Sequence, residues 1–127
     1  MNQKDKQALK RYQDNLKRIK LSGSVNPFET KDDQLARIAK AKKDIKFMVE
    51  YYFPHYATSE CADFHLEFAS MVKRNRTFKG FAQWGRGLAK SVWSDILIPF
   101  WLWMNDEAHY LVIVGNNYDK AKTLLSD

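Results

Sequence analysis

The sequence has few of the residues that cross-link or interrupt a chain: one cysteine, three prolines and five glycines in 127 residues. One cysteine cannot form an internal disulfide, and it excludes four-cysteine metal sites. The longest apolar run, residues 96–104, is far shorter than the roughly 20 residues of a membrane-spanning helix. The first dozen residues are charged throughout, unlike a secretory signal. We therefore expect a soluble protein of a reducing compartment, with one domain at most.

The positive charge is concentrated at one end of the chain. Residues 1–46 carry 13 Lys or Arg against 6 Asp or Glu, whereas residues 47–127 carry 8 against 9. A basic segment attached to a nearly neutral body fits contact with nucleic-acid phosphates. The alternative is a solvated amphipathic helix whose lysines only keep it in solution.

Apolar spacing predicts three helices in the first 76 residues. Residues 3–20 form a basic helix with a single apolar stripe of Leu9, Tyr12, Leu16 and Ile19. Residues 22–27 break it as a polar linker containing Gly and Pro. A second helix begins at an N-cap, Thr30, with Asp33 in its first turn, and ends before Pro54. A third is capped by Ser59 and carries basic residues near its end.

After residue 77 the pattern changes to that of an α/β protein. Residues 78–84 are expected to form a strand, residues 84–87 a glycine-rich turn and residues 89–105 a helix. The β-branched run at residues 110–115 is typical of a parallel strand buried on both faces, and residues 118–125 begin another helix. The predicted fold is thus a helical N-terminal region followed by the first β-α-β-α units of a parallel sheet.

One loop carries recognisable chemistry. A phosphate-binding loop needs small residues so that backbone N–H groups can face the phosphates, then a helix N-terminus with a lysine and a hydroxyl for Mg²⁺. Residues 85–91 fit, with Lys90 and Ser91 opening the helix, although Trp84 and Ala89 replace the two glycines of the usual GxxxxGK[ST] pattern. The alternative is a Gly/Arg-rich turn followed by a chance Lys-Ser.

This loop resembles the variant phosphate loop of the large terminase subunit of tailed bacteriophages, the ATPase motor that packages DNA. The resemblance covers roughly residues 60–127 and rests on the run Gly85, Arg86, Gly87, Leu88, Ala89, Lys90 and Ser91. It implies a P-loop ATPase fold that binds ATP and Mg²⁺. It also implies double-stranded DNA, a portal protein and a small terminase subunit as partners, a ring of subunits, and a place in the cytoplasm of the bacterial host.

The resemblance also implies roles for single residues. Lys90 would contact the β- and γ-phosphates, Ser91 would bind Mg²⁺, and Arg86 would act as a catalytic arginine on the γ-phosphate. The family has an upstream adenine-contacting element that Phe64-His65 is similar to. The alternatives are a surface arginine for Arg86 and a structural histidine for His65.

Two further patterns are interpreted as structural. Residues 106–109 spell DEAH, a helicase motif, but they follow the predicted helix instead of ending a strand beside the loop. The helix itself contains Pro99, expected to kink it, and Trp93, Trp101 and Trp103, expected to be core.

The expected organisation has three parts. Residues 1–22 form the basic amphipathic helix, residues 23–58 a linker and the second helix, and residues 59–127 the start of a P-loop ATPase domain. A P-loop ATPase also needs an acidic residue after a neighbouring strand, but Gly115 and Asn116 follow the run at 110–114. We therefore expect the N-terminal portion of a longer protein, which hydrolyses ATP poorly on its own. The alternatives are another P-loop ATPase or helicase, or a non-enzymatic basic helical module that binds DNA or protein.

Overall fold

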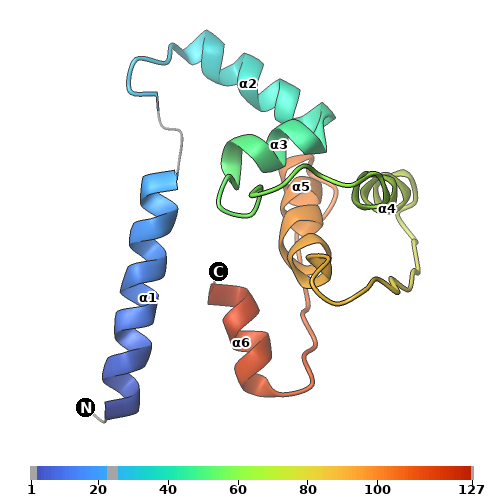
Figure 1. The fold of residues 1–127 in the computed structure, drawn as a ribbon. Coiled ribbons are helices and arrows are strands. Elements are labelled where there is room, and N and C mark those ends of the chain that lie inside the picture. Colours follow the sequence, from blue (N-terminus) through green and yellow to red (C-terminus); the bar gives the residue numbers. More distant parts are fainter. Residues whose placement is uncertain (1–2, 23–25, 127) are drawn as a thin grey trace.

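The computed structural model describes residues 3–22 and 26–126, and every regular element in these ranges is a helix (Figure 1). In chain order they are α1 (Gln3–Ser22), α2 (Lys31–Lys43), α3 (Ile45–Tyr52), α4 (Asp63–Arg74), the π-helical segment η1 (Val92–Leu97), α5 (Ile98–Met104) and α6 (Tyr118–Ser126). In Figure 1, α1 stands to one side, and α3 and α4 lie close to α5. None of the described helices is both long and apolar enough to cross a membrane.

The prediction of an α/β fold with a parallel sheet is wrong for the described part of the chain. Residues 78–84 and 110–115 have no regular secondary structure, and neither segment pairs with another. A strand is stable only when its backbone groups bond to a neighbour, so a β-branched run alone does not make one. Both segments instead expose large side chains, with Phe81 90% exposed and Val114 88% exposed.

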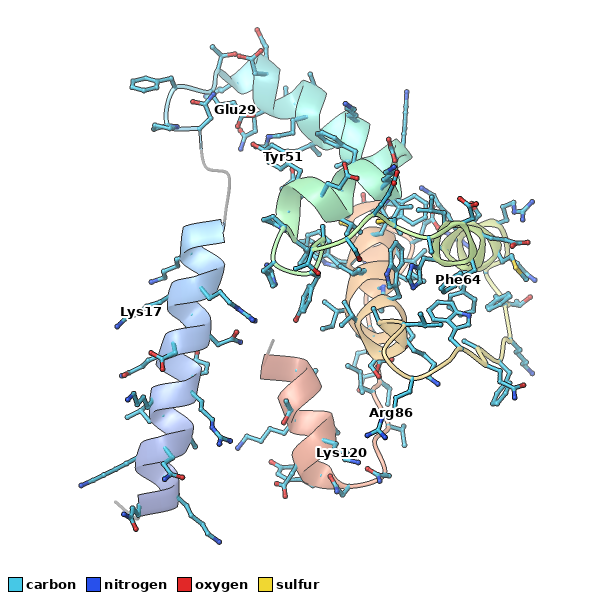
Figure 2. All side chains as sticks on the ribbon, viewed as in Figure 1. Lys17, Glu29, Tyr51, Phe64, Arg86 and Lys120 are labelled. Atoms are coloured by element: carbon cyan, nitrogen blue, oxygen red, sulfur yellow. The ribbon has the colours of Figure 1, made fainter. Side chains whose placement is uncertain are left out.

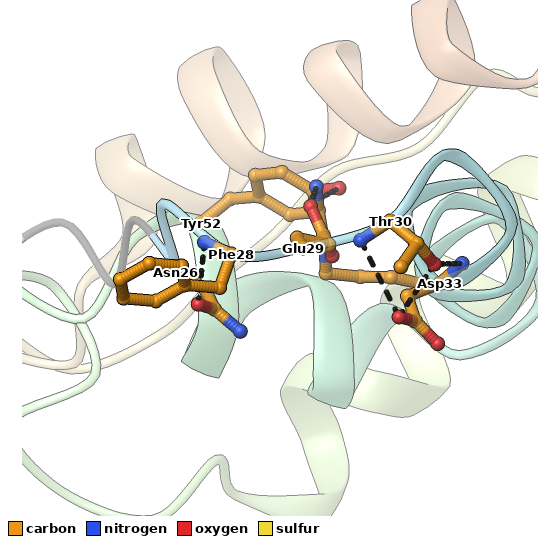
Figure 3. Close-up of polar contacts among 7 residues, drawn as sticks. Asn26, Phe28, Glu29, Thr30, Asp33 and Tyr52 are labelled. Carbon is orange, nitrogen blue, oxygen red and sulfur yellow. Dashed lines mark hydrogen bonds and ion pairs between the residues drawn. The ribbon is translucent and has the colours of Figure 1, made fainter.

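The second predicted helix is divided in two at Asp44. Thr30 and Asp33 form the expected capping box, in which the Asp33 N–H donates to the Thr30 hydroxyl over 3.2 Å (Figure 3). Asp44 adopts an extended conformation, φ −119°, and its carboxylate accepts a hydrogen bond from the Phe47 N–H. An aspartate in this geometry is an efficient N-cap, which ends α2 and starts α3 in a new direction.

An arginine joins the segment before α2 to α3. Arg37 donates from Nε and Nη2 to the two carboxylate oxygens of Glu29, each over 2.7 Å, and from Nη1 to the Tyr52 hydroxyl. Figure 3 shows Glu29 and Tyr52 side by side at this contact. Paired bonds of this kind fix geometry as well as charge. The Arg37 guanidinium accordingly lowers the pKa of Glu29.

The core lies where α2, α3, α4, η1 and α5 meet. Its buried apolar side chains are Ala41, Ile45, Met48, Val49, Ala69, Trp93, Leu97, Ile98 and Trp101. The predicted core role is therefore confirmed for Trp93 and Trp101, but it is wrong for Trp103, which is 59% exposed. Trp101 Nε1 is shared between the Ala41 and Lys42 carbonyls, each at 3.1 Å. The Lys73 ammonium lies 4.0 Å from the Trp101 ring centroid and donates to the Lys42 carbonyl over 3.1 Å.

The predicted helix over residues 89–105 begins at Lys90 and contains a widened turn before Pro99. The Ile98 N–H donates to the Trp93 carbonyl, five residues back, as in a π-helix. Pro99 has no N–H and its ring crowds the preceding turn, so the wider spacing accommodates it. Residues 106–109 then form the turn after α5, with Asp106 at φ 58°.

Candidate phosphate-binding loop

Residues 85–91 form an exposed loop that leads directly into a helix. Gly87 and Ala89 have positive φ, 84° and 54°, and the helix begins at the next residue, Lys90. Left-handed residues alternating with others turn backbone N–H groups to a common side and create an anion-binding concavity. The helix start adds amides that have no partner within the helix and the positive end of its dipole. This backbone geometry is suited to holding phosphate.

The chemically active side chains are all accessible on this loop. Arg86, Lys90 and Ser91 are exposed, and Figure 2 shows Arg86 pointing away from the aromatic rings around Phe64. Two cations and a hydroxyl next to a helix N-terminus can neutralise and orient a polyphosphate. The phosphate-binding role of residues 85–91 stays a prediction.

Behind the loop stands an aromatic cluster that we call the ring cluster: Phe64, His65, Phe68, Trp84 and Trp93. The His65 ring stacks on Trp93 at 4.7 Å between centroids and 6° between planes. Trp84 makes edge-to-face contacts with three rings of the cluster. The distances between ring centroids are 5.1 Å to Phe64, 5.0 Å to His65 and 5.4 Å to Phe68. Edge-to-face contacts of this kind are favourable for aromatic rings. The ring cluster joins α4 to both ends of the loop.

His65 is the buried polar residue of this cluster, 8% exposed, and both of its ring nitrogens contact the backbone. The Ala62 N–H lies 3.3 Å from Nδ1, and Nε2 lies 2.9 Å from the Leu88 carbonyl oxygen. Phe64, by contrast, is 36% exposed. The contact of Phe64-His65 with an adenine base stays a prediction. In this structure His65 reaches the loop itself.

Within residues 85–91, the side chain that could contact Mg²⁺ is the hydroxyl of Ser91. No group of three or more His, Cys, Asp or Glu side chains in the described ranges could hold a metal ion. Mg²⁺ keeps several waters and is commonly bound through substrate phosphates with one or two protein ligands. Ser91, exposed on the first turn of the helix, could supply one protein ligand in that mode, with waters and phosphate oxygens supplying the others.

A mostly apolar hollow lies away from the loop. Its volume is about 480 Å³, and it lies between α5 and residues 108–113, with Pro99, Trp103 and Leu111 among its mostly apolar lining. None of residues 83–91 lines it. It therefore adds nothing to the phosphate chemistry of the loop.

The basic helix α1 is a second candidate surface. Its cations are Lys4, Lys6, Lys10, Arg11, Lys17, Arg18 and Lys20, and each is exposed. The apolar stripe is exposed as well, with Leu9 at 45%, Tyr12 at 51% and Leu16 at 37%, while the Ile19 side chain lies outside the described part. At 3.6 residues per turn, Lys6, Lys10 and Lys17 lie on one face, and Lys4, Arg11 and Arg18 on another.

Sequence reasoning missed the two tryptophans as partners of the loop. Trp84 stands where the usual phosphate loop has its first glycine, and this departure from the pattern was the available signal. No local signal places His65 against Trp93, because 28 positions of chain separate them and only the fold brings them together. No protein-family model, no curated protein and no solved structure matches the chain.

Proposed function

We propose that this chain binds the phosphates of ATP through residues 85–91, as part of a DNA-packaging motor similar to the large terminase subunit. The observation that carries the proposal is the alternation of left-handed Gly87 and Ala89 immediately before a helix that begins with Lys90 and Ser91. The positive φ of Gly87 also agrees with the glycine that the sequence places there. Double-stranded DNA, a portal protein, a small terminase subunit, a ring of subunits and the bacterial cytoplasm belong to this proposal through the resemblance alone.

Each loop residue has a defined task in this proposal. Backbone amides and the Lys90 ammonium hold the β- and γ-phosphates, and the Ser91 hydroxyl takes Mg²⁺ together with phosphate oxygens. Arg86, exposed at the turn, can spread its guanidinium over the γ-phosphate oxygens as charge develops there. A bound Mg²⁺ would neutralise phosphate charge.

The test is calorimetric binding of Mg²⁺ with ADP or a non-hydrolysable ATP analogue. Lys90→Ala should weaken affinity by about ten- to a hundredfold, the cost of a lost charge-assisted hydrogen bond. Lys79→Ala removes another exposed lysine upstream of the loop and is the matched control. Equal affinities of the two variants would contradict the proposal.

A second function, contact of α1 with nucleic acid, is favoured by its two exposed rows of cations. Fluorescence anisotropy of a labelled DNA duplex against salt tests it on the whole chain. Each phosphate contact contributes about 0.9 to the slope of log K against log salt, so replacing Lys6, Lys10 and Lys17 by alanine should reduce that slope by up to about 2.7. Replacing Lys79, Lys120 and Lys122, which are exposed elsewhere, is the control. A slope unchanged by the α1 substitutions would refute this role.

A further inference from the structure

We infer that His65 is a positioning residue that fixes the direction of the Ala89 backbone N–H for phosphate binding. This inference rests on the proposed phosphate-binding function of residues 85–91. It assigns His65 a task at the loop backbone, where the sequence resemblance implies a contact with the base.

The hydrogen bonds of His65 define its tautomer. The Ala62 N–H can only donate, so Nδ1, at 3.3 Å, must carry the lone pair. The neutral ring then has its proton on Nε2, which donates to the Leu88 carbonyl oxygen over 2.9 Å. The Ala62 contact thereby prepares His65 as a donor toward the loop.

The ring is also fixed in orientation. The ring stacks nearly parallel on Trp93, which lies in the helix that follows the loop. It also contacts Trp84, the residue before the loop, at an interplanar angle of 71°. With 8% of its surface exposed, the ring has little freedom to turn. The Leu88 carbonyl therefore meets a donor whose position is set by two tryptophans.

The consequence for the loop follows from peptide geometry. The bond between Leu88 and Ala89 is planar and trans, so its C=O and N–H point in opposite directions. Because the Leu88 oxygen is drawn toward His65, the Ala89 N–H is turned away from the ring cluster. This amide belongs to the left-handed pair Gly87 and Ala89, where it can take part in the anion-binding concavity.

The direct readout is a nuclear magnetic resonance spectrum of one peptide bond. The sequence contains two Leu-Ala pairs, Leu35-Ala36 and Leu88-Ala89. Labelling leucine carbonyls with ¹³C and alanine amides with ¹⁵N therefore gives two cross-peaks. The Ala36 peak reports α2 and serves as the internal control for folding.

Two variants separate hydrogen bonding from packing. His65→Phe keeps an aromatic ring for Trp93 but removes both hydrogen bonds, whereas His65→Gln can supply a donor and an acceptor without the ring. The inference predicts that His65→Phe shifts the Leu88-Ala89 peak and leaves the Ala36 peak in place. It predicts that His65→Gln restores the wild-type position at least in part.

Binding of inorganic pyrophosphate, which has no base, then links the peptide to function. His65→Phe should weaken pyrophosphate and ADP by the same factor, about fivefold for one neutral hydrogen bond, and His65→Gln should recover most of the loss. If only ADP binding falls, His65 acts on the base and the inference is overturned. A loss in His65→Gln with none in His65→Phe would also overturn it, because the aromatic packing of residue 65 on Trp93 would then explain the loss without any hydrogen bond. A wild-type chain that binds neither probe refutes the proposed function, while the cross-peak shift still decides whether His65 orients this peptide.

Discussion

Glycine and alanine exchanges in the loop test its left-handed conformation directly. A Cβ added at Gly87 would meet no heavy atom within 4 Å, so Gly87→Ala has no steric clash to overcome. Its cost is the left-handed backbone itself, at φ 84°, which is about 1–2 kcal/mol for an L-residue. The more restricted unfolded chain offsets about 0.4–1 kcal/mol of this. We expect a net loss of about 1 kcal/mol in the free energy of unfolding.

The reciprocal substitution, Ala89→Gly, should raise stability. Ala89 adopts φ 54° although it has a Cβ, so glycine at this position removes the strain of the left-handed backbone. Glycine also gives the unfolded chain more conformational freedom, which offsets only part of this stabilisation. Gly85→Ala is the matched control, because its Cβ would make an ordinary contact with Leu88 at 3.4 Å and its φ is not left-handed. Urea unfolding followed by tryptophan fluorescence measures all three. Equal destabilisation by Gly85→Ala and Gly87→Ala, or a loss of stability in Ala89→Gly, would refute the reasoning.

Three other predictions concern the core, an ion pair and the thiol. Truncation of Leu97, which is 1% exposed, to alanine should lower the free energy of unfolding by about 3 kcal/mol, measured by urea unfolding. The same change at Leu88, which is 43% exposed, should lower it far less. Similar decreases in the two variants would argue against the core assignment. The hydrogen bond from Arg37 holds the pKa of Glu29 in the folded chain below its usual value of 4.5. Wild type should therefore be more stable than Glu29→Gln by the full amount above pH 4.5, and this difference should vanish as the pH falls through the pKa of Glu29 in the folded chain. Thermal unfolding from pH 7 to pH 2 checks this, and an advantage that persists at the acid end would contradict it. Burial, and to a lesser extent the charge of Glu50, raises the pKa of the Cys61 thiol. Because the thiolate is the form that reacts, iodoacetamide should alkylate Cys61 more slowly in the folded chain than in urea. Equal rates would show that the thiol is not shielded.

The helices were the predictable part of the fold. An apolar stripe predicted residues 3–20, and α1 spans Gln3–Ser22. Thr30 and Asp33 marked the start of α2 because a capping box is encoded locally. The start of α4 was misplaced at Ser59. It begins at Asp63, after the N-cap residue Ala62, whose side chain cannot accept a hydrogen bond. The Ala62 N–H donates to the His65 ring instead, a contact that helix-capping preferences do not predict.

The strands were not predictable, for a different physical reason. Residues 110–115 carry the β-branched pattern of a buried strand, yet a strand requires a second segment with complementary backbone groups, and no described segment supplies it. The sequence pattern of one segment does not show whether the folded chain places a second strand beside it.

The location of the candidate site was predictable, but its support was not. Small residues followed by Lys90 and Ser91 identify the loop locally, and positive φ at Gly87 agrees with its glycine. Positive φ at Ala89 was not indicated by its side chain. The contact between His65 and Leu88 joins residues 23 positions apart, so it depends on the packing of α4 against the loop.

The end of α2 has a consequence for the order in which the fold assembles. The carbonyls of Ala41 and Lys42, which a helix C-terminus leaves without intrahelical partners, are satisfied by the Trp101 indole and the Lys73 ammonium. These caps come from α5 and α4, which lie 59 and 31 positions further along the chain. The boundary at Asp44 is thus completed by distant elements, and in an excised peptide spanning residues 30–53 the last turn of α2 should fray. We therefore expect this helix terminus to form only once α4 and α5 have docked, although the start of α2 is encoded locally by its capping box.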